Sequence, residues 1–409
     1  MSTLMRSRPF ILLWTSTLVS SSGTVLTILA LSIAVYERTG LNLAASAVSA
    51  TQWLMPVLLA PLLASLCVRF APRHLVVAAE GVSAVAALGI GLLVGPAPLV
   101  AGGLLLVRSF LDAVTRSGTP IALKRTLPED VVARGVAHCE AARLYGAAIG
   151  ALAGTLLLGT VPLTTIMLIN TGTLLVSAVV LACARLPRER HNPVAPRGRD
   201  VLAGALATVR ANPLLLRAFV LLAATTAPQA LHNIGRTALS IEHLGLDSAG
   251  VAALAIVTTV ALGVGALLAS VSSRPTLSAA AAWVLLVAPA ALLIVASIVT
   301  GVTASFATYG LFVVLFEVGF VWFSALLVHR APLAAIEEIA ALRTVVLPGV
   351  LCVALVGFGL LVDVVGLLGG ALAYLGCAAV IGVAQQRLLA RAPGDARKEA
   401  APVARDSAE

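Results

Sequence analysis

Long uninterrupted apolar runs recur from one end of the chain to the other. About 20 helical residues cross the hydrocarbon core of a bilayer, and these runs reach that length. Strands of a membrane barrel would instead alternate polar and apolar residues over about ten positions. Backbone groups in lipid must be hydrogen-bonded within the protein, so the runs predict membrane-spanning helices. We place them at residues 10–36, 43–67, 75–94, 98–122, 136–158, 163–184, 214–240, 249–271, 276–299, 302–328, 341–362 and 364–386.

One long polar stretch, 185–199, separates the first six predicted helices from the last six. Its Pro and Arg content indicates a cytoplasmic linker, and a short amphipathic helix is predicted at 201–211. An arrangement of six helices on either side of a basic linker is typical of two pseudo-equivalent halves. The sequence therefore predicts an all-α membrane protein of twelve transmembrane helices in two pseudo-symmetric six-helix bundles, at 1–184 and 214–390. Residues 185–213 form the predicted linker, and 391–409 a disordered cytoplasmic tail.

Composition and charge narrow the class of protein further. The chain is 60% hydrophobic and 11% charged, whereas a soluble domain carries about 25% charged residues. The net charge of +9 does not indicate a nucleic-acid partner, because the basic residues lie in short loops and at the two ends. Their distribution places both termini in the cytoplasm and leaves only Arg38 on the opposite side. Since the high Arg and Ala content suggests a GC-rich bacterial genome, we expect a multi-pass protein of the bacterial inner membrane.

Polar residues inside membrane helices are costly, so each is a functional candidate. Here they concentrate on the first, fourth, seventh and tenth predicted helices, which indicates that these four helices line a polar cavity. The candidates for proton coupling or gating are Arg108, Asp112 and Arg116, which share one face of the fourth helix, and Glu317 of the tenth. The candidates for the substrate cavity are Ser20, Thr24, Gln229, His232, Asn233, Arg236, Phe312 and Phe316.

Several of these residues also have a purely structural interpretation. Arg108 and Asp112 are four residues apart and can pair directly, so the charged face could simply hold helices together. Glu317 could be a neutral, hydrogen-bonded group at a helix contact, or a desolvated acid that carries a proton. His232 could be a satisfied core residue, and the aromatic stripe at 312, 316, 320 and 323 could serve packing.

Four further charged residues lie near predicted cytoplasmic helix ends. There, contact with solvent or a loop is the simpler interpretation than substrate binding. They are Glu80, Glu140, Arg143 and Arg217. On the fifth helix, Gly146, Gly150 and Gly154 form a ridge of small residues that permits close helix approach. The five cysteines have no metal-ligand spacing, and we expect neither a metal site nor a bound cofactor.

Several segments resemble the major facilitator superfamily, and specifically its branch of enterobactin exporters and macrolide-efflux proteins. The resemblance covers essentially the whole chain and rests on Arg8-Pro-Phe-Ile-Leu-Leu-Trp14, Val35-Tyr-Glu-Arg-Thr-Gly40, the segment 119–130 after the fourth helix and the segment 209–217 before the seventh. In the family's loop after the second helix, Arg69 and Arg73 match and are implied to form a cytoplasmic gate loop. Val68 stands where the family has an acidic residue that is expected to lock the cytoplasmic helix ends.

Two other family motifs are matched in part. Arg108 matches the fourth-helix motif of drug antiporters, with Asp112 near an expected glycine. The three glycines of the fifth helix meet the glycine pattern of the antiporter motif there only partly, and its usual proline is absent. The resemblance implies a proton-coupled exporter that works by alternating access and expels a hydrophobic or amphipathic small molecule. Asp112 or Glu317 would exchange the proton, and Arg108 would modulate that exchange.

Other functions remain open at this stage. The chain could take up a metabolite by proton symport, or it could be a sensor or accessory protein that transports nothing. An enzyme is not expected, because the sequence has no nucleophile–base set, metal cluster or phosphate-binding loop. The expected partners are a small-molecule substrate, protons and the lipid bilayer. We expect a monomer powered by the proton gradient.

Overall fold

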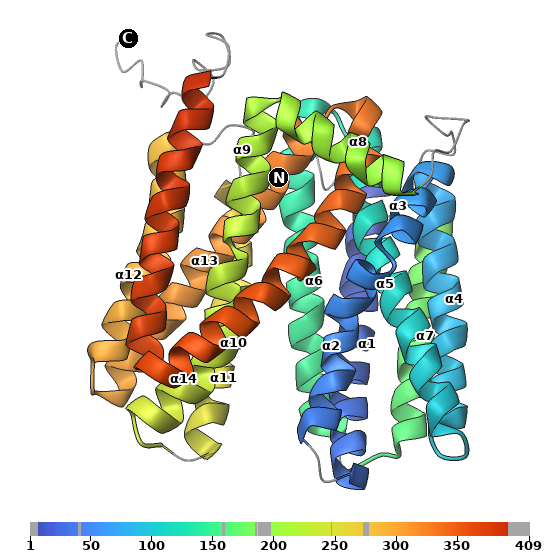
Figure 1. Cartoon of the computed structure of the whole chain (residues 1–409). Helices are drawn as coiled ribbons and strands as arrows, with labels where there is room; N and C mark the ends of the chain where they lie inside the picture. The colour runs from blue at the N-terminus through green and yellow to red at the C-terminus, as the bar shows by residue number, and fades with distance from the viewer. Residues whose placement is uncertain are drawn as a thin grey trace. The chain divides into compact units, whose positions relative to one another are not determined.

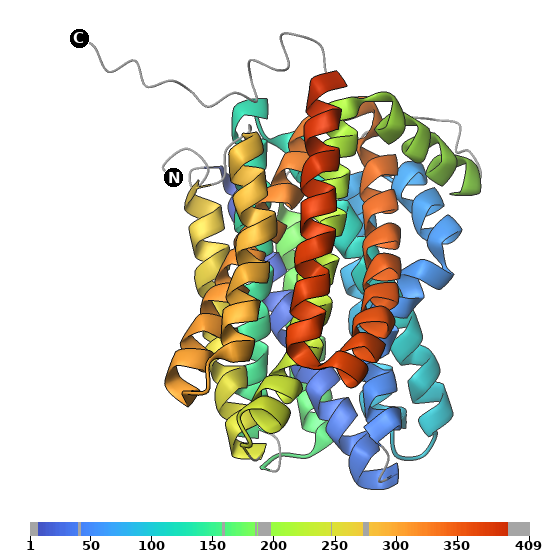
Figure 2. The ribbon, with the colours of Figure 1, turned by 60° about the vertical axis from the view of Figure 1, so that its left-hand side comes forward.

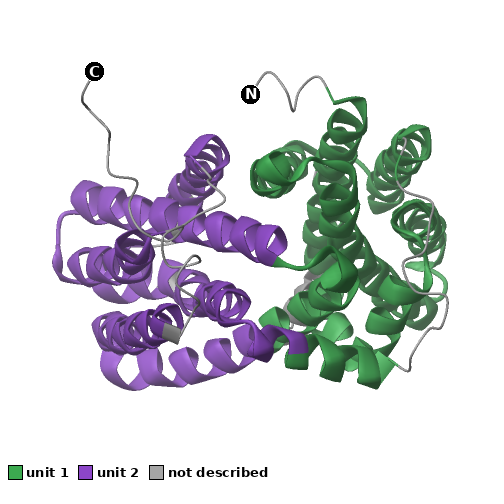
Figure 3. Ribbon diagram, turned by 90° about the horizontal axis from the view of Figure 1, so that it is seen from above, with its two compact units in different colours: residues 1–207, 331–349 green, residues 208–330, 350–409 purple. Residues whose placement is uncertain are grey.

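The computed structural model describes residues 7–39, 42–157, 160–184, 186, 198–246, 248–272 and 278–391. Every regular element among these residues is a helix. The chain divides into two compact units (Figure 3). Unit 1 comprises Met1–Ala207 and Ala331–Gly349, and unit 2 comprises Thr208–Arg330 and Val350–Glu409. The predicted division at 184 and 214 stays a prediction.

Unit 1 is built around its first helix. The helices α1 to α7 of Figure 1 span Arg8–Thr39, Asn42–Leu58, Ala60–Arg69, Pro72–Leu93, Pro98–Thr126, Glu129–Leu157 and Leu163–Cys183, and α8, which begins in this unit, spans Gly198–Ala211. Helix α1 packs against α6 and α7, and α4 packs against α5 and α7. The predicted helices agree with these elements to within several residues at each end, and the predicted amphipathic segment at 201–211 is confirmed as part of α8.

The second predicted helix is the exception, because it is bent by 73° between Leu58 and Ala60. The backbone N–H of Leu59 still donates to Met55 O, 3.0 Å away. Pro61 follows at the start of α3 and has no N–H to continue the helical bonding. The prediction of one continuous helix at 43–67 is therefore wrong, and proline is the physical reason.

Helix α6 lies against the backbone of α1 through two of the predicted glycines. A Cβ atom at Gly146 would lie 2.3 Å from Leu18 O, and one at Gly150 would lie 2.1 Å from Ser22 O. Both distances are far below van der Waals contact, so the two helices can approach this closely only because these residues lack a side chain. The predicted ridge of small residues is confirmed at these two positions.

Unit 2 contains a broken helix and a core built on α13. Its helices span Pro213–Ala224 (α9), Thr226–Thr237 (α10), Ser248–Ser272 (α11), Ala279–Ile298 (α12) and Val302–Arg330 (α13), with a π-helix, η2, at Ala238–His243. Helix α13 packs against both α11 and α12, as the yellow-to-orange helices of Figure 2 show. The break between α9 and α10 falls at Thr225, three residues before Pro228, which has no N–H for the carbonyl of Ala224.

The last helix, α14 (Ile336–Arg391), follows a short 3₁₀ turn, η3 (Leu333–Ala335), and consists of two helical arms that meet at Gly366. The backbone there has φ 72° and ψ 176°, a conformation that is essentially restricted to glycine. Figure 1 shows the sharp turn that results. The two arms correspond to the predicted helices at 341–362 and 364–386, so the predicted boundary at residue 363 falls three residues before the observed turn.

Arg217 of α9 is predicted to contact solvent or a loop, and it contacts a loop while being only 3% exposed. Its Nε donates to Gln385 Oε1 of α14 at 2.9 Å, and its Nη2 donates to Ser278 O at 3.5 Å. Gln385 in turn donates from Nε2 to Ala279 O at 3.3 Å. Arg217 therefore joins α9 to α14 and to the start of α12.

The outer surfaces of these helices are apolar. Val85 is 70% exposed, Leu99 is 90% and Val364 is 82%. Nine helices in the described part are long and apolar enough to cross a membrane, and the bent pair α2–α3 adds one more. One of the nine is α14 with its two arms, and α6 is a further helix of 29 residues. The all-helical membrane fold is thus confirmed, and the number of spans is roughly consistent with the predicted twelve.

The contact of Gly150 with α1 predicts a stability effect. Gly150→Ala should lower the melting temperature of the purified protein, because a methyl group forced onto the Ser22 carbonyl costs about 1–3 kcal/mol. Gly172→Ala on α7 is the matched control, since no atom lies within 4 Å of a Cβ placed there. Thermal unfolding of both variants in the same detergent tests this, and equal melting temperatures would contradict the close contact.

Candidate functional site

One face of α1 carries hydroxyl groups that bind three other helices of unit 1. Ser16, Ser20 and Thr24 recur every four residues and therefore lie on one side of the helix. The Ser16 Oγ lies 2.7 Å from Ser177 Oγ of α7. One turn further, Ser20 binds α4, and after another turn Thr24 binds α5. Ser20 and Thr24 are predicted substrate contacts, and the structure places both in the interior of unit 1.

The partner of Ser20 is Glu80, a residue that sequence reasoning did not select. The Ser20 Oγ lies 3.0 Å from each carboxylate oxygen of Glu80. Glu80 is the ninth residue of α4 and is only 3% exposed. The interpretation of Glu80 as a residue that reaches solvent or a loop is therefore wrong. Helix α4 begins three residues before the predicted start, which places Glu80 deeper, and its partner comes from another helix.

The charged face of α5 separates into two parts. Arg108 is 2% exposed and its Nη2 donates to Thr24 Oγ1 at 3.0 Å, while its Nε has no hydrogen-bond partner. Asp112 instead pairs with Arg116, with Nε and Oδ2 2.7 Å apart. These two side chains are partly exposed, at 23% and 28%, and the Arg116 guanidinium lies 5.7 Å from the centre of the Trp53 ring. The predicted direct pairing of Arg108 with Asp112 does not form.

A second group of charges in unit 1 involves segment 331–349. Arg125 of α5 forms an ion pair with Glu337. Arg343 Nη2 donates to Glu140 Oε1 of α6 at 2.8 Å. A hydroxyl contact accompanies these ion pairs, because Ser117 donates to Thr344 Oγ1 at 2.7 Å. The first turns of α14 are thus held to α5 and α6 by two ion pairs and a hydrogen bond. Glu140, expected to contact solvent or a loop, is 7% exposed and contacts a helix.

In the predicted gate loop after α3, one arginine binds a backbone carbonyl and the other is exposed. Arg73 donates from Nη2 to Ala182 O of α7 at 2.6 Å, and Arg69 is exposed. Val68 is 8% exposed, so the position that carries an acid in the resembled family is a buried apolar site here. Glu140 and Glu337, two buried acids of unit 1, are both in ion pairs.

In unit 2, His232 of α10 lies among aromatic rings of α13. Its ring centroid is 6.1 Å from those of Tyr309 and Phe316, and Phe312 lies between these two rings along the helix. The Tyr309 hydroxyl donates to the backbone carbonyl of His232 at 3.2 Å. His232 is 7% exposed, and its Nδ1 has no hydrogen-bond partner. Phe312 and Phe316 are buried at 0% and 5%, so in this conformation they pack within the unit.

The remaining candidates of unit 2 occupy two environments. Glu317 is 3% exposed and packs against α11, where a Cβ at Gly265 would lie 2.8 Å from the Glu317 Cβ. Gln229 and Arg236 are half-buried, and Asn233 is exposed while its Nδ2 donates to Gln229 O at 2.9 Å. The prediction that helices of both halves line one cavity stays a prediction, as do the site roles of these residues.

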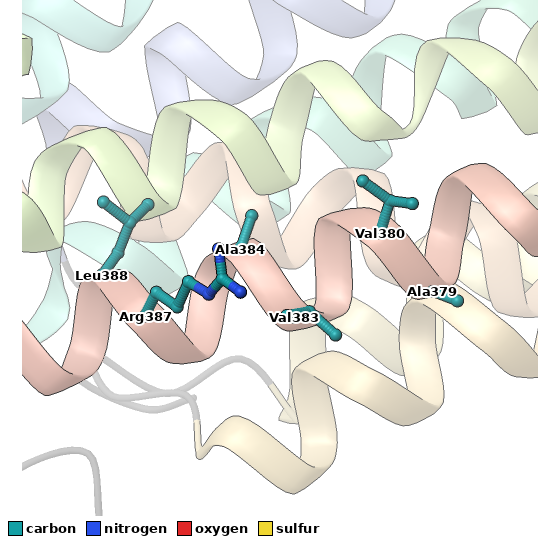
Figure 4. Close-up of a pocket in the computed structure, with 6 residues that line it drawn as sticks. All are labelled: Ala379, Val380, Val383, Ala384, Arg387 and Leu388. Carbon is teal, nitrogen blue, oxygen red and sulfur yellow. The ribbon is translucent and has the colours of Figure 1, made fainter.

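Two hollows lie away from these polar groups. A cavity of about 210 Å³ in unit 1 is lined by apolar residues of α1, α2, α4 and α5, including Leu31, Ile90 and Leu105, with Arg38 at its edge. The Arg38 Nη1 donates to Val94 O at 2.7 Å. A shallow groove follows one face of α14 from Ala379 to Leu388, and Figure 4 shows Arg387 as its one charged lining residue. Among the described residues, no cluster of His, Cys, Asp or Glu could hold a metal ion.

Comparison with solved structures shows the same fold in known transporters. The E. coli fucose:proton symporter FucP is 15% identical, with a TM-score of 0.70 over 94% of this chain and 99% of that one. A bacterial homologue of the iron transporter ferroportin, in an outward-facing state, is 15% identical, with a TM-score of 0.69 over 93% and 99%. The proton:xylose symporter XylE is 12% identical, with a TM-score of 0.67 over 95% and 96%.

Sequence comparison gives the family. The search against curated proteins found no match. The family description of the Major Facilitator Superfamily matches residues 13–346, which is most of the chain and extends into both units. A match of this extent indicates a transporter and not an enzyme, and the chain belongs to the major facilitator superfamily.

Proposed function

We propose that the chain is a proton-coupled exporter of a hydrophobic or amphipathic small molecule that works by alternating access. The observation that carries this proposal is the set of charges on α5, Arg108, Asp112 and Arg116, in a largely apolar bundle of a transporter family. Charges at such positions are costly and are kept where ions or substrates move. The outward direction is supported by the likeness of residues 8–14, 35–40, 119–130 and 209–217 to the exporter branch.

Two acids are proposed to exchange the proton, one in each unit. Asp112 is partly exposed beside Arg116, and Glu317 is buried against α11. A carboxylate that gains a proton loses its charge, which lowers the cost of moving it through an apolar environment. Arg108 lies one turn from Asp112 and interacts with it electrostatically. It would therefore influence when Asp112 releases its proton.

Polar groups of α10 and the aromatic side chains of α13 are proposed to contact the substrate. Gln229, Asn233 and Arg236 are wholly or partly accessible. His232 lies at the edge of the aromatic cluster with one ring nitrogen unpartnered. This combination of polar groups and aromatic rings suits a molecule with an aromatic or aliphatic hydrophobic part and a few polar groups. We place the protein in the bacterial inner membrane as a monomer with both termini in the cytoplasm.

Proton-coupled uptake of a metabolite is the second candidate. Two proteins with this fold, FucP and XylE, are symporters of protons with fucose and xylose. Everted membrane vesicles with an acidic lumen separate the two functions. An exporter that exchanges protons would accumulate ethidium or labelled erythromycin in them. A symporter would instead accumulate L-fucose or D-xylose in right-side-out vesicles placed in acidic buffer. The absence of any flux in reconstituted liposomes would favour a sensor or accessory role.

The proposed coupling residues predict a loss of driven uptake. In everted vesicles with an acidic lumen, Asp112→Asn and Glu317→Gln should each reduce ethidium uptake toward the level of vesicles without the protein. Each change removes a titratable group while keeping the size of the side chain. Asp130→Asn is the matched control, because Asp130 is an exposed acid at the start of α6. If Asp112→Asn and Glu317→Gln both leave uptake intact, the assignment of coupling to these residues is wrong.

We also propose that the ion pairs of segment 331–349 form the cytoplasmic gate. Arg125–Glu337 holds this segment to the last turn of α5, and Glu140–Arg343 holds it to α6. They must break for an opening to form between these elements. Removing one partner of a buried ion pair costs about 3–5 kcal/mol because the other charge is left uncompensated. Arg143, whose Nη1 lies 3.7 Å from Glu140 Oε2, would retain part of that compensation when Arg343 is replaced.

The gate predicts a change in the accessibility of Cys67. This thiol is 1% exposed and lies near Ser117, whose hydroxyl donates to Thr344. In a variant that retains only this cysteine, Glu140→Gln should accelerate labelling of Cys67 by N-ethylmaleimide. Unchanged labelling in Glu140→Gln would contradict the proposed gate.

A further inference from the structure

Glu80 is a buried acid of unit 1 whose direct partner is a neutral hydroxyl. Its carboxylate oxygens each lie 3.0 Å from Ser20 Oγ, and the residue is 3% exposed. In the described part of the chain, no Arg, Lys or His nitrogen lies within 4.0 Å of this carboxylate. Asp112 differs, because Arg116 compensates its charge at 2.7 Å. Glu80 therefore lacks a fixed cation, and Asp112 has one.

The charged groups that act on Glu80 come from α5. They are Arg108 and Asp112, and their opposite charges act on the Glu80 carboxylate in opposite directions. Helices α1 and α7, which both lie beside this site, contribute the hydroxyls of Ser20 and Ser177. The other titratable residues of α4, and of α3, which also contacts it, are Arg73, His74, Cys67 and Arg69, and none forms an ion pair with Glu80.

The surroundings of Glu80 can satisfy the carboxyl group with or without a proton. When it is ionised, the Ser20 hydroxyl donates to it. When it is protonated, the new O–H can donate to Ser20 Oγ, and the Ser20 hydroxyl can turn toward the backbone carbonyl one helical turn before it. Binding a proton forms one O–H bond on the carboxylate and removes one proton from water, with no other covalent change. A site that accommodates both states suits reversible protonation.

Arg108 is a buried cation that is bound to a neutral hydroxyl. It is 2% exposed, one nitrogen donates to Thr24 Oγ1, and its Nε has no acceptor. Thr24 lies one turn beyond Ser20 on the same face of α1. The acid and the cation are thus bound to neighbouring turns of one helix, and an ionised Glu80 would attract Arg108 away from Thr24. Protonation of Glu80 would release Arg108 to Thr24.

We infer that Glu80 is a proton-carrying residue of this transporter and that Arg108 alternates between Thr24 and the Glu80 carboxylate as the proton is bound and released. This inference rests on the proposed proton-coupled transport. It adds to the coupling set a residue of α4, and it gives Arg108 a defined role in unit 1.

The test uses the full chain in liposomes with ethidium as the transported probe. Glu80→Gln keeps the shape of the side chain and a partner for Ser20, but it cannot bind a proton. We expect it to abolish uptake driven by a proton gradient while ethidium exchange at equal pH on both sides continues at the wild-type rate. Glu80→Asp should retain driven uptake in part, and the exposed control Asp130→Asn should retain it fully.

Two measurements that need no substrate test proton binding directly. Infrared difference spectra of the purified protein between acidic and alkaline pH should contain the band of protonated carboxyl groups, and Glu80→Gln should remove the part of that band that comes from Glu80. In the wild-type protein, a hydrophobic carbodiimide, which reacts with protonated carboxyls, should modify Glu80 at acidic pH, as read by mass spectrometry. Because this second measurement uses the wild-type protein, it tests proton binding by Glu80 even if the variant does not fold.

Each outcome bears on one of the two proposals. Driven uptake that persists in Glu80→Gln, an unchanged infrared band or an unmodified Glu80 would overturn the role of Glu80. Loss of both driven uptake and exchange in a variant with the wild-type melting temperature would also overturn it, because Glu80 would then be needed for substrate passage. Wild-type protein that exchanges ethidium but ignores the proton gradient would refute the proposed function, whatever Glu80 binds.

Discussion

The structure depends on one constraint, which is that polar groups inside an apolar bundle must find partners within that bundle. Lipid offers no hydrogen bonds, so a buried hydroxyl, carboxylate or guanidinium is stabilised only by another side chain or by a backbone carbonyl. Unit 1 meets this constraint with α1, whose hydroxyls at Ser16, Ser20 and Thr24 bind three neighbouring helices in turn. The same helix is approached closely by α6 at Gly150. Hydrogen bonding and close packing therefore converge on one helix, and the other helices are positioned relative to it.

The constraint separates the buried charges into two kinds. Glu140 and Arg343 compensate each other directly, so their ionised states hold the chain in one arrangement until the pair is broken. Glu80 and Arg108 are bound instead to neutral hydroxyls, which leaves each able to exchange its partner without leaving a charge isolated. A carrier needs both kinds, since one kind stabilises a conformation and the other responds to a proton. That the two kinds occur on separate parts of the same unit is consistent with separate gating and coupling.

Hydropathy predicted the helices well because their length and apolar surface are local properties of the sequence. The four-residue spacing of Gly146 and Gly150 also identified them, because it places both on one helical face. The bend at Leu59 was missed because proline changes direction without interrupting the apolar run. Glu80 was missed for a different reason. Its depth depends on where α4 begins, and its partner comes from α1, sixty residues earlier in the chain. Neither the pairing of charges between helices nor their burial can be read from spacing along one helix.

The loop after α3 lacks the acidic residue of the family motif, and ion pairs elsewhere in unit 1 can hold the helix ends in its place. Val68 is buried, so an aspartate in its place would need a compensating donor in an apolar site. Two buried acids elsewhere in unit 1, Glu140 on α6 and Glu337 on α14, each have an arginine partner. These two ion pairs connect α14 to both α5 and α6. The absence of the family's acid at Val68 is thus compatible with a gate whose ionic contacts lie on α5 and α6.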